Sequence, residues 1–268
     1  MTINVNYQQL GFGAPVIILH GLLGNHRNWL TVGKKISGSF SVFLPDARNH
    51  GSSPHHPHMN YFDMADDLYS FILQNQLQDV TLIGHSMGGK TAMTFALNNP
   101  EIVKQLIVID IAPINYENDL GELFDIMQGL NTGQLKSRAE ATAYFKASID
   151  NHQFNQYLVS NLKFENSQFK WRINLPVIAD SISTIRAFPK FDENKIYLGS
   201  TVFINGEQSD YILDQHQPAI LEKFPNAIFR TIPMSGHNPH VDQPDHLNEI
   251  LCKIMNIQNN DPADKTDF

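Results

Sequence analysis

The first half of the chain alternates short, almost wholly apolar runs with longer segments of helical periodicity. The apolar runs are rich in β-branched residues, as strands covered on both faces of a sheet must be, and they span Val16–His20, Ser41–Asp46, Val80–His85 and Leu106–Ile111. The segments with helical spacing between them are Trp29–Ile36, Tyr61–Gln74 and Met87–Asn98. Strands that alternate with helices in this way predict parallel pairing with right-handed crossovers.

The alternation breaks in the middle of the chain, between about Pro113 and Lys195, where no convincing strand pattern occurs. This segment predicts several amphipathic helices, over about Asp119–Leu130, Lys136–Asp150 and Val177–Phe188. The alternation then resumes with strands and helices in turn, at Ser200–Asn205, Tyr211–Phe224, Ala227–Pro233 and Pro244–Met255.

The whole pattern predicts an α/β fold, a mostly parallel central sheet flanked by helices. We expect residues 1–112 and 196–255 to form the core and residues 113–195 to form a helical insertion. The insertion leaves from the carboxyl end of a strand, the edge at which open α/β sheets hold their ligands. We therefore expect a cap over the active site, with extra covering of the core as the alternative. The polar residues 256–268 predict a frayed tail.

Composition narrows the range of partners. The 268 residues carry a net charge of −8, so no basic surface is available to hold the phosphates of a nucleic acid. No apolar run approaches the ~18 residues that a membrane span needs, and the N-terminus lacks the features of a signal peptide. These features predict a soluble, cytoplasmic protein. The single cysteine, Cys252, excludes an internal disulfide and a cysteine-rich metal site, and nothing in the composition points to a particular oligomeric state.

The most specific motif is the segment Gly84–Gly88, which reads G-H-S-M-G between a predicted strand and a predicted helix. A G-x-S-x-G segment at such a junction is typical of a nucleophile elbow, in which a sharp turn exposes the serine hydroxyl. The backbone N–H groups at the start of the following helix would face developing negative charge. Ser86 is therefore the predicted nucleophile.

A second motif, His20-Gly21-Leu22-Leu23-Gly24, follows the first core strand. An oxyanion hole needs two donors aimed at one point. The N–H of Met87, directly after the nucleophile, predicts one donor, and the N–H of Leu22 is the best candidate for the other.

The general base must be chosen among twelve histidines by position. His237 follows the last predicted strand and precedes the last helix, so its loop lies at the same sheet edge as the elbow. We predict that His237 removes the proton from Ser86. His20 and His85, which belong to these two motifs, are candidates for supporting residues.

Two carboxylates compete for the role of the acid that orients the base. Asp110 ends the strand after the nucleophile's helix, and Asp210 lies in the loop after the next strand. Many enzymes of this fold place the acid in that later loop, but the aligned position there is Ser209. Asp110 follows an apolar run and is expected to be partly buried, so Asp110 is the favoured acid, with Asp210 as the alternative.

Several stretches together resemble the YbfF-type esterases of the α/β-hydrolase superfamily and their mitochondrial relatives. They read HGLLGNHRNW, PDARNHGSSPH, GHSMGGKTAM, VIDIAP and SGHNPHVDQP, and the resemblance runs from residue 3 to about residue 255. The segment Asp46–Gly51 reads D-A-R-N-H-G, where most relatives of this fold have D-x-R-G-H-G. The resemblance implies an acid at the end of the sixth strand, here Asp110, with the insertion following that strand. It also implies that Ser209 joins the hydrogen-bond network of the site.

The activity that the resemblance implies is hydrolysis of short acyl esters, with acyl-CoA thioesters as further candidates. The expected route is a two-step acyl transfer through Ser86 that requires neither a metal nor a cofactor. Lyases, hydrolases of carbon–carbon bonds and ligand receptors use the same fold and the same triad, so these functions stay open at this point. A haloalkane dehalogenase is disfavoured because its nucleophile position would hold an aspartate.

Overall fold

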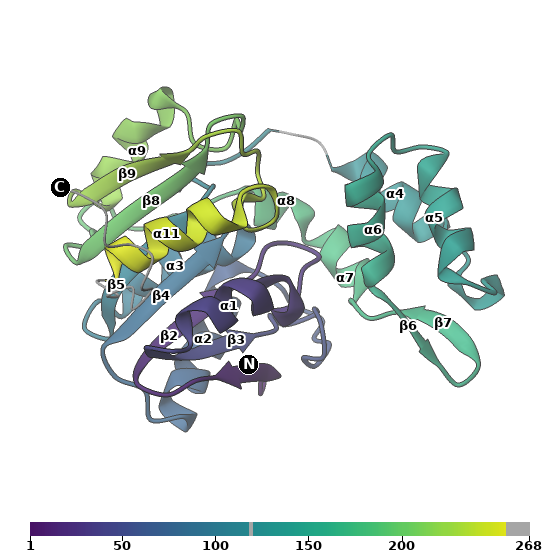
Figure 1. Cartoon of the computed structure of the whole chain (residues 1–268), viewed down its shortest axis with the longest axis horizontal. Helices are drawn as coiled ribbons and strands as arrows, with labels where there is room; N and C mark the ends of the chain where they lie inside the picture. Colours follow the sequence, from purple (N-terminus) through teal and green to yellow (C-terminus); the bar gives the residue numbers. More distant parts are fainter. Residues whose placement is uncertain (118–119, 256–268) are drawn as a thin grey trace, which may run out of the picture.

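The computed structural model describes residues 1–117 and 120–255 and is built around one seven-stranded sheet (Figure 1). The strand order is β1-β3-β2-β4-β5-β8-β9, with β1 antiparallel to β3 and every other neighbouring pair parallel. The strands of this sheet are β1 Tyr7–Leu10, β2 Ala14–Leu19, β3 Phe40–Pro45, β4 Val80–His85, β5 Val103–Ile109, β8 Ser200–Gly206 and β9 Ala227–Ile232. The predicted parallel α/β sheet is confirmed.

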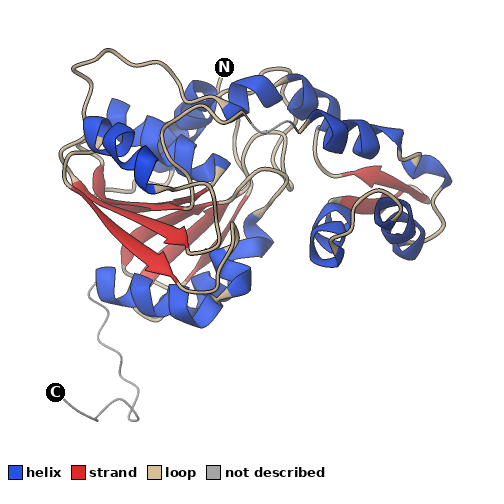
Figure 2. Ribbon diagram, turned by 90° about the horizontal axis from the view of Figure 1, so that it is seen from above, coloured by secondary structure: helices blue, strands red, loops and turns tan. Residues whose placement is uncertain are grey.

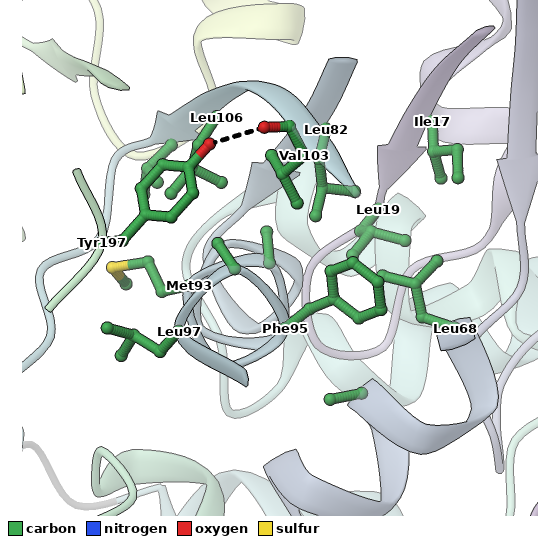
Figure 3. Packing of buried hydrophobic residues seen from close by; sticks show 14 of the residues in the cluster. Ile17, Leu19, Leu68, Leu82, Met93, Phe95, Leu97, Val103, Leu106 and Tyr197 are labelled. Carbon is green, nitrogen blue, oxygen red and sulfur yellow. Dashed lines mark hydrogen bonds between the residues drawn. The ribbon is translucent and has the colours of Figure 1, made fainter. Parts of the chain in front are cut away.

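Helices cover both faces of the sheet, as Figure 2 shows. The helices of the core are α1 Leu30–Ile36, α2 Tyr61–Gln74, α3 Met87–Asn98, α9 Gln217–Lys223, α10 Pro239–Asp242 and α11 Pro244–Ile254. Because successive side chains of a strand point to opposite faces, Val16 and Ile18 of β2 pack with α1 and α11. Ile17 and Leu19 pack with α2 and α3, on the face seen in Figure 3.

The insertion forms a separate group of elements beside the sheet (Figures 1 and 2). Its elements are α4 Gly121–Gly129, α5 Arg138–Lys146, α6 His152–Ser160, β6 Leu162–Glu165, β7 Gln168–Trp171, α7 Leu175–Asp180 and α8 Ile182–Arg186. They share an apolar cluster that includes Phe124, Phe145 and Ile178 and extends to Met64 of α2 and Met87 of α3. The insertion therefore packs on the start of the helix that follows Ser86.

The prediction that the insertion contains no strand is wrong, because β6 and β7 pair as an antiparallel hairpin. Each strand has only four residues, and only Leu162 and Phe169 among them are buried, so the alternation of apolar and polar positions is weak. The turn is Asn166-Ser167, and both residues have positive φ, 52° and 64°. Positive φ at both central positions is the geometry of a two-residue hairpin turn.

Other sequence expectations also need correction. The short strand β1 and the helix α6 were not expected, and the insertion follows β5, the fifth strand along this chain rather than a sixth. Along this chain, the one strand before β2 is β1, so the strand that ends just before Asp110 is counted as the fifth. The predicted tail, residues 256–268, lies outside the described residues. Within the described part of the chain, none of the helices is both long and apolar enough to cross a bilayer.

A buried lysine joins the insertion to α3, the helix that begins after Ser86. Lys90 of α3 is only 1% exposed. Its ammonium donates to the carbonyl of Ile114 at 2.8 Å, where the chain leaves the core, and to the carbonyls of Arg186 and Ala187 at 2.7 and 3.0 Å, where it returns. Burial lowers the pKa of Lys90 to about 7, while three carbonyl acceptors favour its protonated form. Lys90 thus fastens both junctions of the insertion to one turn of α3.

Replacing Lys90 by methionine should loosen both junctions, because three carbonyl oxygens lose the donor that Lys90 supplies while the unbranched side chain is shortened by only one atom. We expect faster amide hydrogen exchange at residues 114–117 and 186–188, and a free energy of unfolding lower by about 1–3 kcal/mol. Lys104→Met, which alters an exposed lysine of β5, is the matched control. Unchanged exchange at both junctions in Lys90→Met would contradict this role.

Candidate active site

The side chain of Ser86 is presented by a strained turn between β4 and α3. Ser86 has φ 52° and ψ −120°, a left-handed conformation that a residue with a side chain adopts only at an energetic cost. The two glycines of the motif allow the tight approach: a Cβ on Gly84 would lie 2.3 Å from the carbonyl oxygen of Gly88, and one on Gly88 would lie 2.4 Å from that of Leu19. The geometry is that of the predicted nucleophile elbow.

The imidazole of His237 lies between Ser86 and Asp110. Its Nε2 is 3.0 Å from the Ser86 Oγ, and its Nδ1 is 2.7 Å from an oxygen of Asp110. With the proton on Nδ1 donated to the carboxylate, Nε2 is free to accept the hydroxyl proton of Ser86. The structure therefore brings the three predicted residues together in one hydrogen-bonded chain, although they lie 24 and 127 positions apart along the sequence.

Asp110 is held where β5 ends and the chain turns toward the insertion. It is fully buried and has φ 53°. Besides the bond from His237, its carboxylate accepts a hydrogen bond from the Ser209 hydroxyl and another, at 3.0 Å, from the backbone N–H of Gly206. Ser209 thus occupies the supporting position that was expected. Asp210, the alternative acid, is exposed, so the carboxylate next to the imidazole is that of Asp110.

Two further aromatic side chains fix the loop that carries His237. His85 donates through Nε2 to the backbone carbonyl of His237 at 2.7 Å, and burial together with the neighbouring histidines lowers the pKa of His85 well below its ordinary value. Tyr211 stacks on the His237 imidazole with 3.8 Å between ring centroids. The hydroxyl of Tyr116 donates to the Tyr211 carbonyl at 2.5 Å. Tyr211 was not singled out from the sequence, and its only signal is its place two residues after Ser209.

The loop after β2 packs directly against Ser86. A Cβ on Gly21 would lie 3.0 Å from the His85 ring and 3.3 Å from the Cβ of Ser86, so the backbone approaches Ser86 closely at this point. His20 accepts the N–H of Ala47 at Nε2, 3.0 Å away, and its Nδ1 is 2.8 Å from the Gly21 carbonyl. Burial lowers the pKa of His20. The neutral ring therefore links the loops that follow β2 and β3.

His50 also supports the loop after β2. Its Nε2 accepts the N–H of Leu23 at 3.1 Å, and its Nδ1 donates to the Arg48 carbonyl at 2.9 Å. Burial lowers the pKa of His50 to about 3, so it stays neutral and can act as an acceptor. Leu23 has φ 61°. This strained residue and its bond to His50 fix the position of the preceding residue, Leu22.

The rest of the D-A-R-N-H-G segment holds the turn that follows β3. The Arg48 guanidinium is fully buried and forms two bonds to the Asp67 carboxylate, at 2.7 and 2.8 Å. The Asp46 carboxylate accepts the backbone N–H groups of His26 and Ser52, at 2.7 and 2.8 Å. A Cβ on Gly51 would lie only 2.2 Å from the Asp46 carboxyl carbon, which explains the glycine there.

The helix α6 of the insertion also contacts the loop after β2. The Tyr157 hydroxyl donates to the Leu22 carbonyl at 2.7 Å, and the Asn161 amide donates to the Leu23 carbonyl at 2.8 Å. Since the carbonyl oxygens of Leu22 and Leu23 are engaged from the insertion, the orientation of the peptide units in this loop depends on α6. Neither contact had a recognisable sequence signal.

A cavity of about 570 Å³ lies against Ser86 and His237, between the core and the insertion. Ligand pockets have volumes of roughly 300–1,000 Å³. Part of the wall is apolar and comes from α4, α8 and neighbouring residues, namely Leu120, Leu123, Ile182, Ile185 and Met87. The helix α6 contributes the polar side chains of Gln153, Gln156 and Ser160 together with the aromatic rings of Phe154 and Tyr157. Residues 1–117 and 120–255 contain no group of three or more histidine, cysteine, aspartate or glutamate side chains placed to hold a metal ion.

Comparison with known proteins agrees with this geometry. Residues 14–244 match the family described as alpha/beta hydrolase fold. The chain is 34% identical to the sn-1-specific diacylglycerol lipase ABHD11 of Danio rerio, over 91% of this chain and 80% of the relative. It is 30% identical to esterase YbfF of Escherichia coli (strain K12), over 91% and 93% of the two chains. The solved structure of a marine microorganism esterase is 36% identical, with a TM-score of 0.92, and the match covers 94% of this chain and 99% of that one.

The family match covers residues 14–244, and the similarity to esterase YbfF covers 91% of the chain. The expected relationship to the YbfF-type esterases is therefore confirmed. The chain belongs to the α/β-hydrolase fold family.

Proposed function

We propose that the protein is a serine esterase that hydrolyses carboxylic esters through an acyl-enzyme on Ser86. The observation that carries this proposal is the continuous hydrogen-bonded chain from the Ser86 hydroxyl through His237 to Asp110, at the wall of a cavity. Relatives named esterase or lipase over nine-tenths of the chain support the reaction class.

In the first step, the Ser86 oxygen attacks the ester carbonyl while the His237 Nε2 takes the hydroxyl proton. The imidazolium that forms keeps its Nδ1 bond to Asp110, whose charge stabilises it. His237 then gives the proton to the leaving alcohol as the tetrahedral intermediate collapses, which leaves the acyl group bound to the Ser86 oxygen. In the second step, water loses a proton to His237 as its oxygen attacks the acyl carbonyl. The bond from the acyl carbon to the Ser86 oxygen then breaks, His237 returns the proton to that oxygen, and the acid is released.

We assign the two oxyanion donors to the N–H groups of Leu22 and Met87. Met87 is the first residue of α3, so its N–H has no partner within the helix. The loop of Leu22 approaches Ser86 closely at Gly21 and is fixed by His50 and Tyr157. One such donor stabilises a transition state by ~3 kcal/mol.

The insertion, residues 113–195, acts in this proposal as a cap that completes the substrate pocket. Leu120, Leu123 and Ile182 would receive the acyl chain, and the polar side chains of α6 would face the alcohol. Short acyl esters are the proposed substrates. An acyl-CoA thioester presents the same carbonyl to Ser86, so thioesters are included in the proposed class.

Ser86→Ala should abolish turnover, because the nucleophilic oxygen is removed while the fold is kept. A fluorophosphonate probe should label the wild-type protein and not the variant, as seen by intact-mass spectrometry, and a panel of 4-nitrophenyl esters of graded acyl length should show the same contrast. Turnover that persists in Ser86→Ala, with an unchanged melting temperature, would rule out the proposed nucleophile.

Asp110→Asn should lower kcat by about 10³–10⁴-fold, because the amide cannot stabilise the imidazolium and favours the wrong tautomer of His237. Asp210→Asn, which alters the exposed neighbouring carboxylate, should leave kcat within about twofold of wild type. Steady-state kinetics on one 4-nitrophenyl ester decide between them. The opposite ranking would move the acid to the loop after β8.

Stability in acid should depend on His50. An unfolded histidine binds a proton below about pH 6.5, whereas folded His50, with its pKa lowered to about 3, does not. Between these values the unfolded state binds more protons, so stability falls as the pH is lowered, by up to ~1.4 kcal/mol per pH unit for this group. His50→Leu should remove that part of the slope.

Urea unfolding at several pH values measures the slope for His50→Leu and wild type. From about pH 7 to 9 the histidine is neutral in both states, so the difference between the two proteins should be constant there. Curves that stay parallel down to about pH 4 would show that His50 is not held neutral by the fold.

A further inference from the structure

The wall of the active-site cavity carries positive charge, although the whole chain has a net charge of −8. Lys90 and Arg186 both line the cavity. Among the residues that the structure describes, the cavity lining includes no aspartate or glutamate. Charges of one sign in a partly closed cavity concentrate ligands of the opposite sign.

The ammonium of Lys90 contributes charge but has no donor left for a ligand. An ammonium group has three N–H donors, and those of Lys90 already reach the carbonyls of Ile114, Arg186 and Ala187. These acceptors are neutral and do not compensate the charge of the protonated form, which is partly populated near neutral pH because burial lowers the pKa of Lys90 to about 7. Lys90 therefore favours an anion in the cavity without binding it directly.

The guanidinium of Arg186, in contrast, keeps most of its donors. Its Nε donates to the Tyr116 carbonyl at 3.1 Å. Its own backbone carbonyl accepts from Tyr116 and Lys90, at 3.1 and 2.7 Å. These three bonds anchor the residue at the end of α8. A guanidinium has five N–H donors in a planar fork, and within residues 1–117 and 120–255 no hydrogen bond or ion pair engages the two terminal nitrogens of Arg186.

The residues around Arg186 indicate what an anionic ligand would look like. Ile182 lies four positions earlier on the same helix, and residues four apart share one face. Ile182 and Arg186 both line the cavity, so α8 presents an apolar side chain followed by a cation. A short run of methylene groups ending in a carboxylate matches that order, and a carboxylate matches the planar fork of the guanidinium.

We propose that Arg186 binds a carboxylate at the far end of the substrate's acyl chain, so that the preferred substrates are monoesters of short dicarboxylic acids. This inference rests on the ester hydrolysis proposed above and names its substrate class. Arg186 acts as a specificity-determining residue: it binds the end of the acyl chain and takes no part in proton transfer. The ester bond is cleaved by Ser86 and His237 as described.

Two esters of equal chain length test the proposal. In 4-nitrophenyl hydrogen glutarate a carboxylate replaces the terminal methyl of 4-nitrophenyl pentanoate, and the leaving group is the same. Wild-type protein should show the higher kcat/KM on the glutarate ester. In Arg186→Gln the ratio of the two kcat/KM values should fall about ten- to a hundredfold, the size expected for charge-assisted hydrogen bonds. Arg186→Lys should retain part of the preference.

The matched control is Lys190→Gln, which removes an exposed cation a few residues beyond Arg186 and should leave the ratio unchanged. Melting temperatures establish that each variant is folded. A wild-type preference for pentanoate, or a ratio that is the same in wild type and Arg186→Gln, would overturn the role of Arg186.

A binding measurement separates this inference from the proposed function. Glutarate should bind Ser86→Ala, as measured by calorimetry, more tightly than pentanoate, and Arg186→Gln in the same background should remove the difference. If wild type hydrolyses neither ester while glutarate still binds through Arg186, the esterase proposal fails and the anion site stands. If both esters are hydrolysed through Ser86 and glutarate shows no preference, the anion site fails and the esterase proposal stands.

Discussion

The arrangement of the site depends on the burial of one carboxylate, that of Asp110. A carboxylate removed from water needs hydrogen-bond donors, because losing its hydration is costly. Its donors come from the end of β8 and the turn after it, through Gly206 and Ser209, and from the loop after β9, through His237. These three contacts bring two distant loops to the end of β5. The position of the His237 imidazole is therefore a consequence of the hydrogen bonds that the buried Asp110 carboxylate requires.

Backbone strain gathers at the same edge of the sheet. Ser86, Asp110 and Leu23 follow β4, β5 and β2, and all three have positive φ, at 52°, 53° and 61°. Residues with side chains adopt such conformations only where the surrounding structure holds them. Here the parallel pairing of β2 with β4 and of β4 with β5 holds the ends of these strands at fixed spacing, so the energy of the core maintains the strained turns.

The sequence was sufficient to predict the features that follow from the periodicity of apolar residues and from the positions of glycines. Short apolar runs and the longer helical segments between them predicted the parallel sheet, and the boundaries of α2 and α3 were predicted to the residue. The glycines around Ser86 marked the elbow because no other residue fits there. Position relative to the strands pointed to His237 and Asp110.

What the sequence did not reveal are contacts whose partners are backbone atoms or ring faces. Lys90 and Tyr157 bond to carbonyl oxygens, and every residue type supplies a carbonyl. Tyr211 stacks on His237 through a ring face, and contacts of this kind follow no fixed spacing along the sequence. The hairpin of β6 and β7 was missed because its strands are short and mostly exposed. Such features require tertiary structure, since one-dimensional patterns record only local preferences.

The two bonds from α6 to the loop after β2 bear on how substrate admission relates to catalysis. Tyr157 and Asn161 belong to the insertion, yet the carbonyl oxygens that they bind belong to the loop of Leu22. Any swing of α6 away from the core must break these bonds and release the peptide units beside Ser86. With the oxyanion donors proposed above, an open conformation would admit ester while those donors are out of alignment, so that chemistry would begin only after closure. One movement of α6 would then determine both whether substrate can enter and whether the site can react, and the two conditions would not occur together.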